Sequence, residues 1–191
     1  KHFRQYKEGV INEYEYNQIK DKGCPGSGAC PVMGTANTMA AMSEALGMSL
    51  PGNTATPGAD SRLQRIAFEA GRQVVKLHQE RVTPSSIMKL NAFNNAIRVL
   101  MALGGSTNGV LHLQAIAAEL DLELELETFN SISKETPLIV DIAPSGSGKY
   151  LMSDLDEAGG IPSAMKELES LLHTEVKTVM GRSLAEDLAL A

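Results

Sequence analysis

The stretch that most constrains the fold is a glycine-rich segment, residues 24–39, which holds both cysteines of the chain, Cys24 and Cys30. It runs directly into an apolar helical pattern, so the loop must deliver a cysteine to the start of a helix. The N–H groups and the positive end of a helix dipole favour a thiolate there. Glycines let the backbone approach a bulky inorganic group closely. The segment therefore indicates a metal site.

Two other interpretations of the cysteines stay open. Both could be buried as small hydrophobic side chains, which is a common fate of a free cysteine. A short disulfide is less favoured, because nothing else in the sequence resembles a secreted protein. Two thiols alone cannot complete a four-cysteine zinc or iron–sulfur site, so further ligands would lie outside this sequence or would not be thiolates.

Composition excludes several classes of function. The chain has 191 residues and a net charge of −6, which argues against a nucleic-acid partner bound through a basic patch. No apolar run approaches the length of a membrane span, and the polar N-terminus is no signal peptide. We therefore expect a cytoplasmic protein without a membrane partner. The chain starts with Lys1, and residues 183–191 have the pattern of a helix that continues, so we expect a piece of a longer protein.

Periodicity predicts a helix-rich chain. Helices are expected over residues 2–21 (two short ones, hinged at Gly9), 35–47, 61–80, 89–103, 110–120, 128–133, 151–158, 161–172 and from 183 onward. The helix at 110–120 is apolar nearly all round, which predicts that it is buried. The alternation at 122–126 and the β-branched run at 137–143 predict strands, with a further strand at 176–180. The expected fold class is α/β, a single helix-rich layered domain over residues 1–191 with a short, mostly parallel sheet.

Two polar loops could bind an anion. Residues 104–109 open a helix with hydroxyls, an amide and free backbone N–H groups, although Ser, Thr and Asn also cap helices for purely structural reasons. Residues 143–150 have a composition close to that of a phosphate-binding loop. Ala143 replaces its first glycine, and Tyr150 stands where a magnesium-binding hydroxyl is needed. The second loop therefore argues against a nucleoside triphosphatase, while its backbone N–H groups could still bind an anion.

Several short motifs occur together and in a fixed order. The first are Cys-Pro-Gly-Ser-Gly-Ala-Cys at 24–30, Met-Gly-Thr-Ala-Asn-Thr-Met at 33–39, Glu-Ala-Leu-Gly-Met at 44–48 and Leu-Pro-Gly at 50–52. They are followed by Gly-Gly-Ser-Thr-Asn at 104–108, Leu-His-Leu at 111–113, Pro-Ser-Gly at 144–146, Lys-Tyr-Leu-Met at 149–152 and Ala-Gly-Gly-Ile-Pro at 158–162. Through this ordered series the chain resembles the dihydroxy-acid dehydratase/6-phosphogluconate dehydratase family over essentially its whole length.

Members of this family are iron–sulfur enzymes that dehydrate 2,3-dihydroxy acids to 2-keto acids, so the resemblance implies a fragment of a hydro-lyase, from its N-terminal cluster-binding region. It implies that Cys30 is the third of three cysteines that hold a 2Fe–2S or 4Fe–4S cluster, with Cys24 a less favoured ligand. The other two cysteines, the ligands of Mg²⁺ and the serine base are expected outside these residues. The resemblance also implies a homo-oligomer, a dimer or a tetramer. The residues expected to line the pocket for a small dihydroxy acid are Gly105, Ser106, Thr107, Asn108 and Ser145.

The substrate is less well defined. Many family members have Gly-Gly-Met-aromatic-Thr-Ala after the ligand cysteine, whereas this chain has Pro-Val-Met-Gly-Thr-Ala at 31–36. Gly34 is similar to the sugar-acid branch, and the upstream motif is closer to the branched-chain amino-acid biosynthetic branch. We expect the branched-chain substrate, of the 2,3-dihydroxy-isovalerate type. An aldonate dehydratase of the same family, or a non-catalytic binding domain with buried cysteines, are the alternatives.

Overall fold

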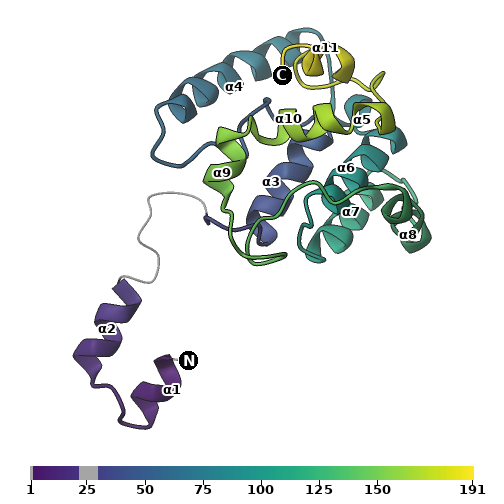
Figure 1. The fold of residues 1–191 in the computed structure, drawn as a ribbon. Coiled ribbons are helices and arrows are strands. Elements are labelled where there is room, and N and C mark those ends of the chain that lie inside the picture. The colour runs from purple at the N-terminus through teal and green to yellow at the C-terminus, as the bar shows by residue number, and fades with distance from the viewer. Residues whose placement is uncertain (1, 22–29) are drawn as a thin grey trace.

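The computed structural model describes residues 2–21 and 30–191; Lys1 and residues 22–29, which include Cys24, lie outside this part (Figure 1). The first helices are α1 (His2–Lys7), α2 (Glu13–Asp21), α3 (Thr35–Ala45), α4 (Arg62–Gln79), α5 (Pro84–Ile87) and α6 (Leu90–Ala102). They are followed by α7 (Asn108–Ala118), α8 (Leu126–Glu135), α9 (Met152–Glu157), α10 (Gly160–Glu167) and α11 (Leu184–Leu188). A short 3-10 turn, η1 (Glu169–Leu171), follows α10.

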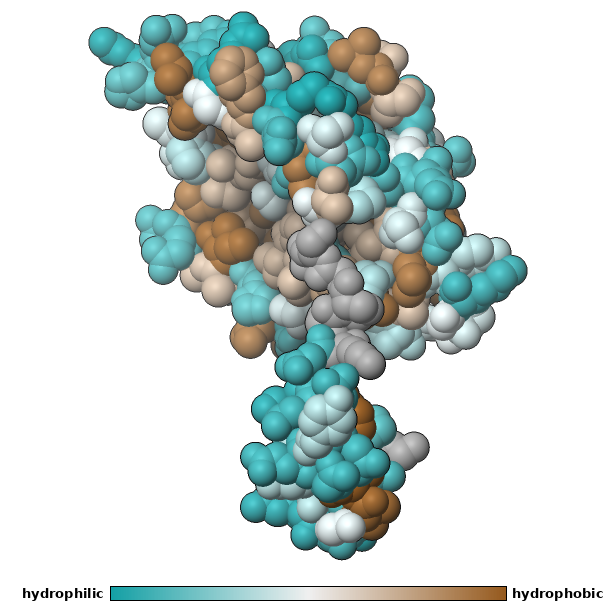
Figure 2. Space-filling model, turned by 90° about the vertical axis from the view of Figure 1, so that its left-hand side faces the viewer, coloured by the Kyte–Doolittle hydropathy of each residue, from teal (hydrophilic) through white to brown (hydrophobic). Residues whose placement is uncertain are grey.

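The helices α1 and α2 form an N-terminal arm that lies apart from the other helices in Figure 1. The chain turns between them at Gly9, whose φ is +69°, as expected for a hinge glycine. Asn12 and Glu15 cap α2 reciprocally, each side chain accepting the backbone N–H of the other at 2.9 Å. Tyr6 stacks on Tyr16 with the ring centroids 4.9 Å apart. Hydrophilic residues dominate the surface of the arm (Figure 2), in keeping with two helices that bury none of their own residues.

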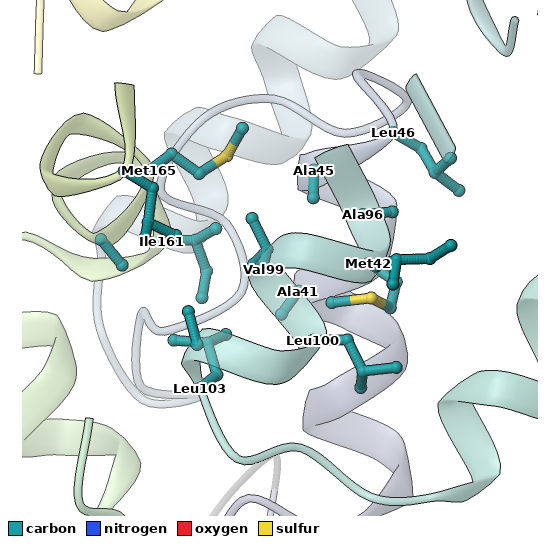
Figure 3. Close-up of a cluster of buried hydrophobic side chains, with 14 of the residues drawn as sticks. Ala41, Met42, Ala45, Leu46, Ala96, Val99, Leu100, Leu103, Ile161 and Met165 are labelled. Atoms are coloured by element: carbon teal, nitrogen blue, oxygen red, sulfur yellow. The ribbon is translucent and has the colours of Figure 1, made fainter. Parts of the chain in front are cut away.

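The core lies where α3, α6 and α10 meet (Figure 3). Ala41 and Ala45 on α3 and Ala96 on α6 are all buried, and their small side chains let the two helices approach closely. Larger side chains fill the remaining space, and burying each one stabilises the fold by roughly 2 kcal/mol. They include Met42, Val99, Leu100, Ile161 and Met165.

The predicted parallel sheet is wrong. Within residues 2–21 and 30–191 no strand forms, and β-pairing is limited to two isolated bridges, Ile142 with Tyr150 and Lys177 with Ser183. The described part of the chain is therefore helical rather than α/β, and the segments at 122–126, 137–143 and 176–180 pair with no neighbouring strand there.

The apolar run at 137–143 shows why the strand prediction failed. The N–H of Ile139 donates to the carbonyl of Ala102 at the end of α6, at 2.9 Å, so its partner is a helix terminus rather than a strand. Leu138 and Ile139 are 65% and 39% exposed. A β-branched apolar run has the same sequence whether or not a second strand lies beside it, so the pattern could not decide the outcome.

The alternation at 122–126 has another explanation. Leu124 alone of its three leucines is buried, and its carbonyl accepts a hydrogen bond from Nε2 of Gln114 on α7 at 2.9 Å. The extended residues then enter α8 at Leu126, which is 61% exposed. Residues 122–126 are therefore an extended connection between α7 and α8 that is hydrogen-bonded to α7.

The prediction of a fully buried helix at 110–120 is also wrong. Leu113 and Ala117 of α7 are buried, whereas Leu111 is 66% exposed and His112 lies on the surface. The residues of α7 are apolar nearly all round, but the described part of the chain covers only one side of it. An apolar sequence pattern thus overestimates burial here.

Candidate functional site

Cys30 lies in the loop that leads into α3, and among the described residues it is a free, exposed cysteine. The side chain of Asn37, in the first turn of α3, reaches back to this loop. Its Nδ2 donates to the carbonyl oxygens of Cys30, at 2.5 Å, and Val32, at 2.7 Å. One buried amide therefore fixes the main chain on both sides of Pro31, while Cys30 itself remains exposed.

The same loop is held from its other side by segments more than a hundred residues further along the chain. The N–H of Met33 donates to the carbonyl of Ala143 at 2.7 Å, and the N–H of Met152 donates to the carbonyl of Pro31 at 2.8 Å. The extended segment before the 144–149 loop and the first residue of α9 thus border the cysteine loop. Met33 is itself buried, which anchors the loop in the core.

The loop at 104–108 meets α3 through side chains. Thr38 Oγ1 accepts the backbone N–H of Ser106 at 2.9 Å, and Asn108 Nδ2 donates to Thr35 Oγ1 at 2.8 Å. The hydroxyls of Thr35 and Ser106 lie 3.3 Å apart. These contacts bring the N-termini of two eleven-residue helices, α3 and α7, to one place. The positive ends of the helix dipoles make such a place favourable for an anion.

Two glycines allow this close approach. A Cβ added at Gly105 would lie 2.8 Å from Leu100 Cδ1 and 3.1 Å from Thr38 Cγ2. A Cβ added at Gly109 would lie 2.8 Å from the same Leu100 atom. All three distances are below ordinary contact distance, so larger residues at these positions would push α7 away from α3 and α6.

The 144–149 loop lies beside the 104–108 loop. Ser145 Oγ donates to the carbonyl of Gly104 at 3.4 Å, a long contact. The carboxylate of Asp141 orders the same loop by accepting the backbone N–H of Ser147, at 2.7 Å, and its hydroxyl. These hydrogen bonds from Ser147, together with the charge of Lys149, lower the pKa of Asp141.

The five residues expected at the pocket lie on these two neighbouring loops: Gly105, Ser106, Thr107, Asn108 and Ser145. The carbonyl of Cys30 is bound by Asn37, in the same first turn of α3 that Ser106 and Asn108 contact. Cys24, the less favoured ligand, lies outside the described residues. Sequence reasoning missed Thr35, Asn37 and Thr38 as individual site residues. Their signal was the Met-Gly-Thr-Ala-Asn-Thr-Met motif, which places three polar side chains in the first turn of a helix otherwise expected to be apolar.

The donor set limits what the described residues can hold. Within them, no three His, Cys, Asp or Glu side chains come together as a metal site. Cys30 is exposed and precedes the N-terminus of α3, so it is accessible as one ligand of a larger cluster. These residues therefore fit an iron–sulfur cluster only as the source of one ligand, as the sequence motifs imply.

A buried carboxylate lies at the other end of α3. Glu44 is 7% exposed and accepts the backbone N–H groups of Gly52, at 3.0 Å, and Thr54, at 2.5 Å. Burial raises the pKa of Glu44, and the hydrogen bonds from Thr54 and Gly52 oppose that rise. It is about 14 Å from Thr35 along the helix axis at 1.5 Å per residue, so it belongs to the support of the fold and not to the Cys30 region.

None of the helices in residues 2–21 and 30–191 has the length and apolar character needed to cross a bilayer.

Residues 1–187 match the family model described as "Dihydroxy-acid/6-phosphogluconate dehydratase N-terminal". A curated dihydroxy-acid dehydratase of Moorella thermoacetica is 50% identical over 183 residues, covering 95% of this chain and 33% of the relative.

Two further curated relatives have slightly lower identities. A dihydroxy-acid dehydratase of Clavibacter michiganensis is 48% identical over 95% of this chain and 32% of the relative. A protein named dihydroxy-acid dehydratase 2, of Staphylococcus saprophyticus, is 46% identical over 96% of this chain and 33% of the relative. The chain spans about one third of the length of the curated relatives that it matches.

Proposed function

Because the chain belongs to the dihydroxy-acid/6-phosphogluconate dehydratase family, we propose that it is the N-terminal cluster-binding part of a hydro-lyase that converts a 2,3-dihydroxy acid to a 2-keto acid. The observation that carries this proposal is the exposed Cys30 beside the N-terminus of α3, in a chain that matches the family model from residue 1 to 187. The curated relatives are named dihydroxy-acid dehydratases, which supports a dihydroxy acid as the substrate. Among dihydroxy acids, we propose the branched-chain type.

Cys30 would supply one thiolate ligand to an iron–sulfur cluster, with the other ligands outside the described residues. When bound, the cluster would supply a Lewis acid for the departure of the β-hydroxyl, and Mg²⁺, whose ligands are expected outside these residues, would polarise the carboxylate end of the substrate.

The residues of this chain would orient the substrate. The hydroxyls of Ser106 and Ser145 and the amide of Asn108 can hydrogen-bond a hydroxylated carboxylate, and all three lie close to the loop that carries Cys30. The N-termini of α3 and α7 add positive potential where the substrate's negative charge would lie. Loss of the C2 proton is assigned to a base outside these residues.

The proposal also covers the oligomeric state and the location of the enzyme in the cell. A homo-oligomer, either a dimer or a tetramer, and a cytoplasmic location are expected for the whole enzyme. An aldonate dehydratase is the second candidate function, because Gly34 follows the pattern of the sugar-acid branch.

Anaerobic cluster reconstitution of the full-length protein tests the ligand assignment. Cys30→Ser should lose most of the visible absorption and bound iron, while Cys24→Ser, the matched control, should keep both. Unchanged spectra in Cys30→Ser would overturn the assignment. Comparing turnover of 2,3-dihydroxy-isovalerate with that of aldonic acids separates the two substrate classes, and faster turnover of an aldonic acid would favour the second.

A further inference from the structure

We propose that Asn37 is a positioning residue, whose side-chain amide fixes the main chain of Cys30 so that its thiol is held in one place for a metal. The inference rests on the proposed function, because Cys30 is a ligand only there. It adds a residue that contacts neither metal nor substrate and acts through the backbone of the cysteine loop.

The geometry of the amide carries the inference. Asn37 is 3% exposed, and its Nδ2 donates to two carbonyl oxygens, those of Cys30 and Val32. Because the amide is buried, water cannot readily replace these hydrogen bonds when the loop moves away. The two bonds together fix the position of the peptide groups on either side of Pro31.

The direction of the hydrogen bonds shows that they serve the loop rather than the helix. A residue that caps a helix N-terminus offers a side-chain oxygen to the free N–H groups of the first turn. Asn37 does the opposite, because its nitrogen donates to carbonyls that precede the helix. Gly34, at the N-cap of α3, offers no side-chain cap. The helix therefore gains no capped N–H group from these two bonds.

A second buried asparagine provides a matched control. Asn95 on α6 is 1% exposed and holds the backbone of His173, donating to its carbonyl at 3.0 Å and accepting its N–H at 2.8 Å. It resembles Asn37 in type, burial and attachment to a loop, but that loop contains none of the candidate site residues. Replacing it reports what the loss of a buried asparagine does to the fold alone.

The test compares full-length Asn37→Ala and Asn95→Ala proteins, with Asn37→Ser as a smaller change that keeps one hydroxyl donor. Two quantities are measured: iron release from the reconstituted protein to a chelator, and hydrogen exchange over residues 30–34 of the metal-free protein. We expect Asn37→Ala to release iron about tenfold faster, the lower range for loss of a residue that supports a metal ligand, with faster exchange at 30–34. Asn37→Ser should lie between it and the wild type.

Asn95→Ala should lower thermal stability while leaving both readouts at the wild-type value. An equal change in Asn95→Ala would overturn the proposal, since the effect would then be general destabilisation. Wild-type iron release and exchange in Asn37→Ala would overturn it as well. If Cys30→Ser keeps the cluster, the proposed function fails by itself, because exchange in the metal-free protein tests the hold of Asn37 independently.

Discussion

Helices α3 and α4 differ in how much of their surface is buried, and the difference is the opposite of what their sequence patterns suggest. The α4 helix has 18 residues, separates its apolar and polar residues more sharply than α3, and buries none of them. The α3 helix has 11 residues and a weaker pattern, yet six are buried: Asn37, Thr38, Ala41, Met42, Glu44 and Ala45. A strong amphipathic pattern shows which side of a helix is apolar, whereas burial depends on how many neighbours surround it.

The buried polar residues of α3 explain its central place. Asn37 binds the loop at 30–32, Thr38 binds the loop at 106, and Glu44 binds the loop at 52–54. Each of these three side chains makes at least one hydrogen bond, as is usual for buried polar residues. On α4 the exposed side includes Phe68 and Val75, which are 68% and 56% exposed. Helix α3 therefore holds three loops through buried polar side chains, whereas α4 lies on the surface.

The largest expected effect compares the replacement of a phenylalanine in the core around α3 with the replacement of a phenylalanine on α4. Phe93, on α6 beside α3, is fully buried, so Phe93→Ala should lower the free energy of unfolding by about 3–5 kcal/mol. Phe68→Ala on α4 should change it by less than about 0.5 kcal/mol. Urea denaturation followed by circular dichroism measures both. Similar losses in the two variants would show that α4 is packed as tightly as the core.

A second test replaces one glycine that packs against the core and one glycine on α4. The two replacements should change the stability of the fold in opposite directions. Gly109→Ala should destabilise the fold by about 1–3 kcal/mol, because the new methyl group meets Leu100 and Thr38. Gly71, in the middle of α4, has open space around its Cβ position, so Gly71→Ala should stabilise by about 0.5–1 kcal/mol through helix propensity. Thermal unfolding distinguishes the two signs. Destabilisation by Gly71→Ala would mean that a neighbour contacts this face of α4.

The smallest expected effect concerns charge. Burial raises the pKa of Glu44, so the folded state binds its proton more tightly than the unfolded state does. The resulting stabilisation is complete below the ordinary pKa of 4.5 and is lost as pH rises through the raised value. The stability of the wild type relative to Glu44→Gln should therefore fall as pH rises across this window. Glu69→Gln on the surface of α4 serves as the control, and an equal pH dependence in that pair would contradict the assignment.

The sequence predicted the helices better than their surroundings. The helix expected at 89–103 is observed as Leu90–Ala102, because its apolar spacing is local information. The absent sheet and the exposed side of α7 depend on neighbours, which a single segment does not encode. For the candidate site, ordered motifs pointed to Cys30 and to the loop that includes Asn108. Both loops attach to the first turn of α3, and the second attachment uses hydrogen bonds across about seventy residues, such as that from Asn108 to Thr35, which become visible only in the fold.

Asn37 and Thr38 are consecutive residues, and one attaches the cysteine loop while the other attaches the loop that contains Ser106. The two attachment points are therefore only one peptide unit apart, and any sliding or tilting of α3 would move both loops together. Under the proposed function, the distance between the metal ligand and the substrate-binding hydroxyls would stay constant during such a movement. Discrimination between a short branched acid and a long sugar acid would then have to come from residues outside these two loops.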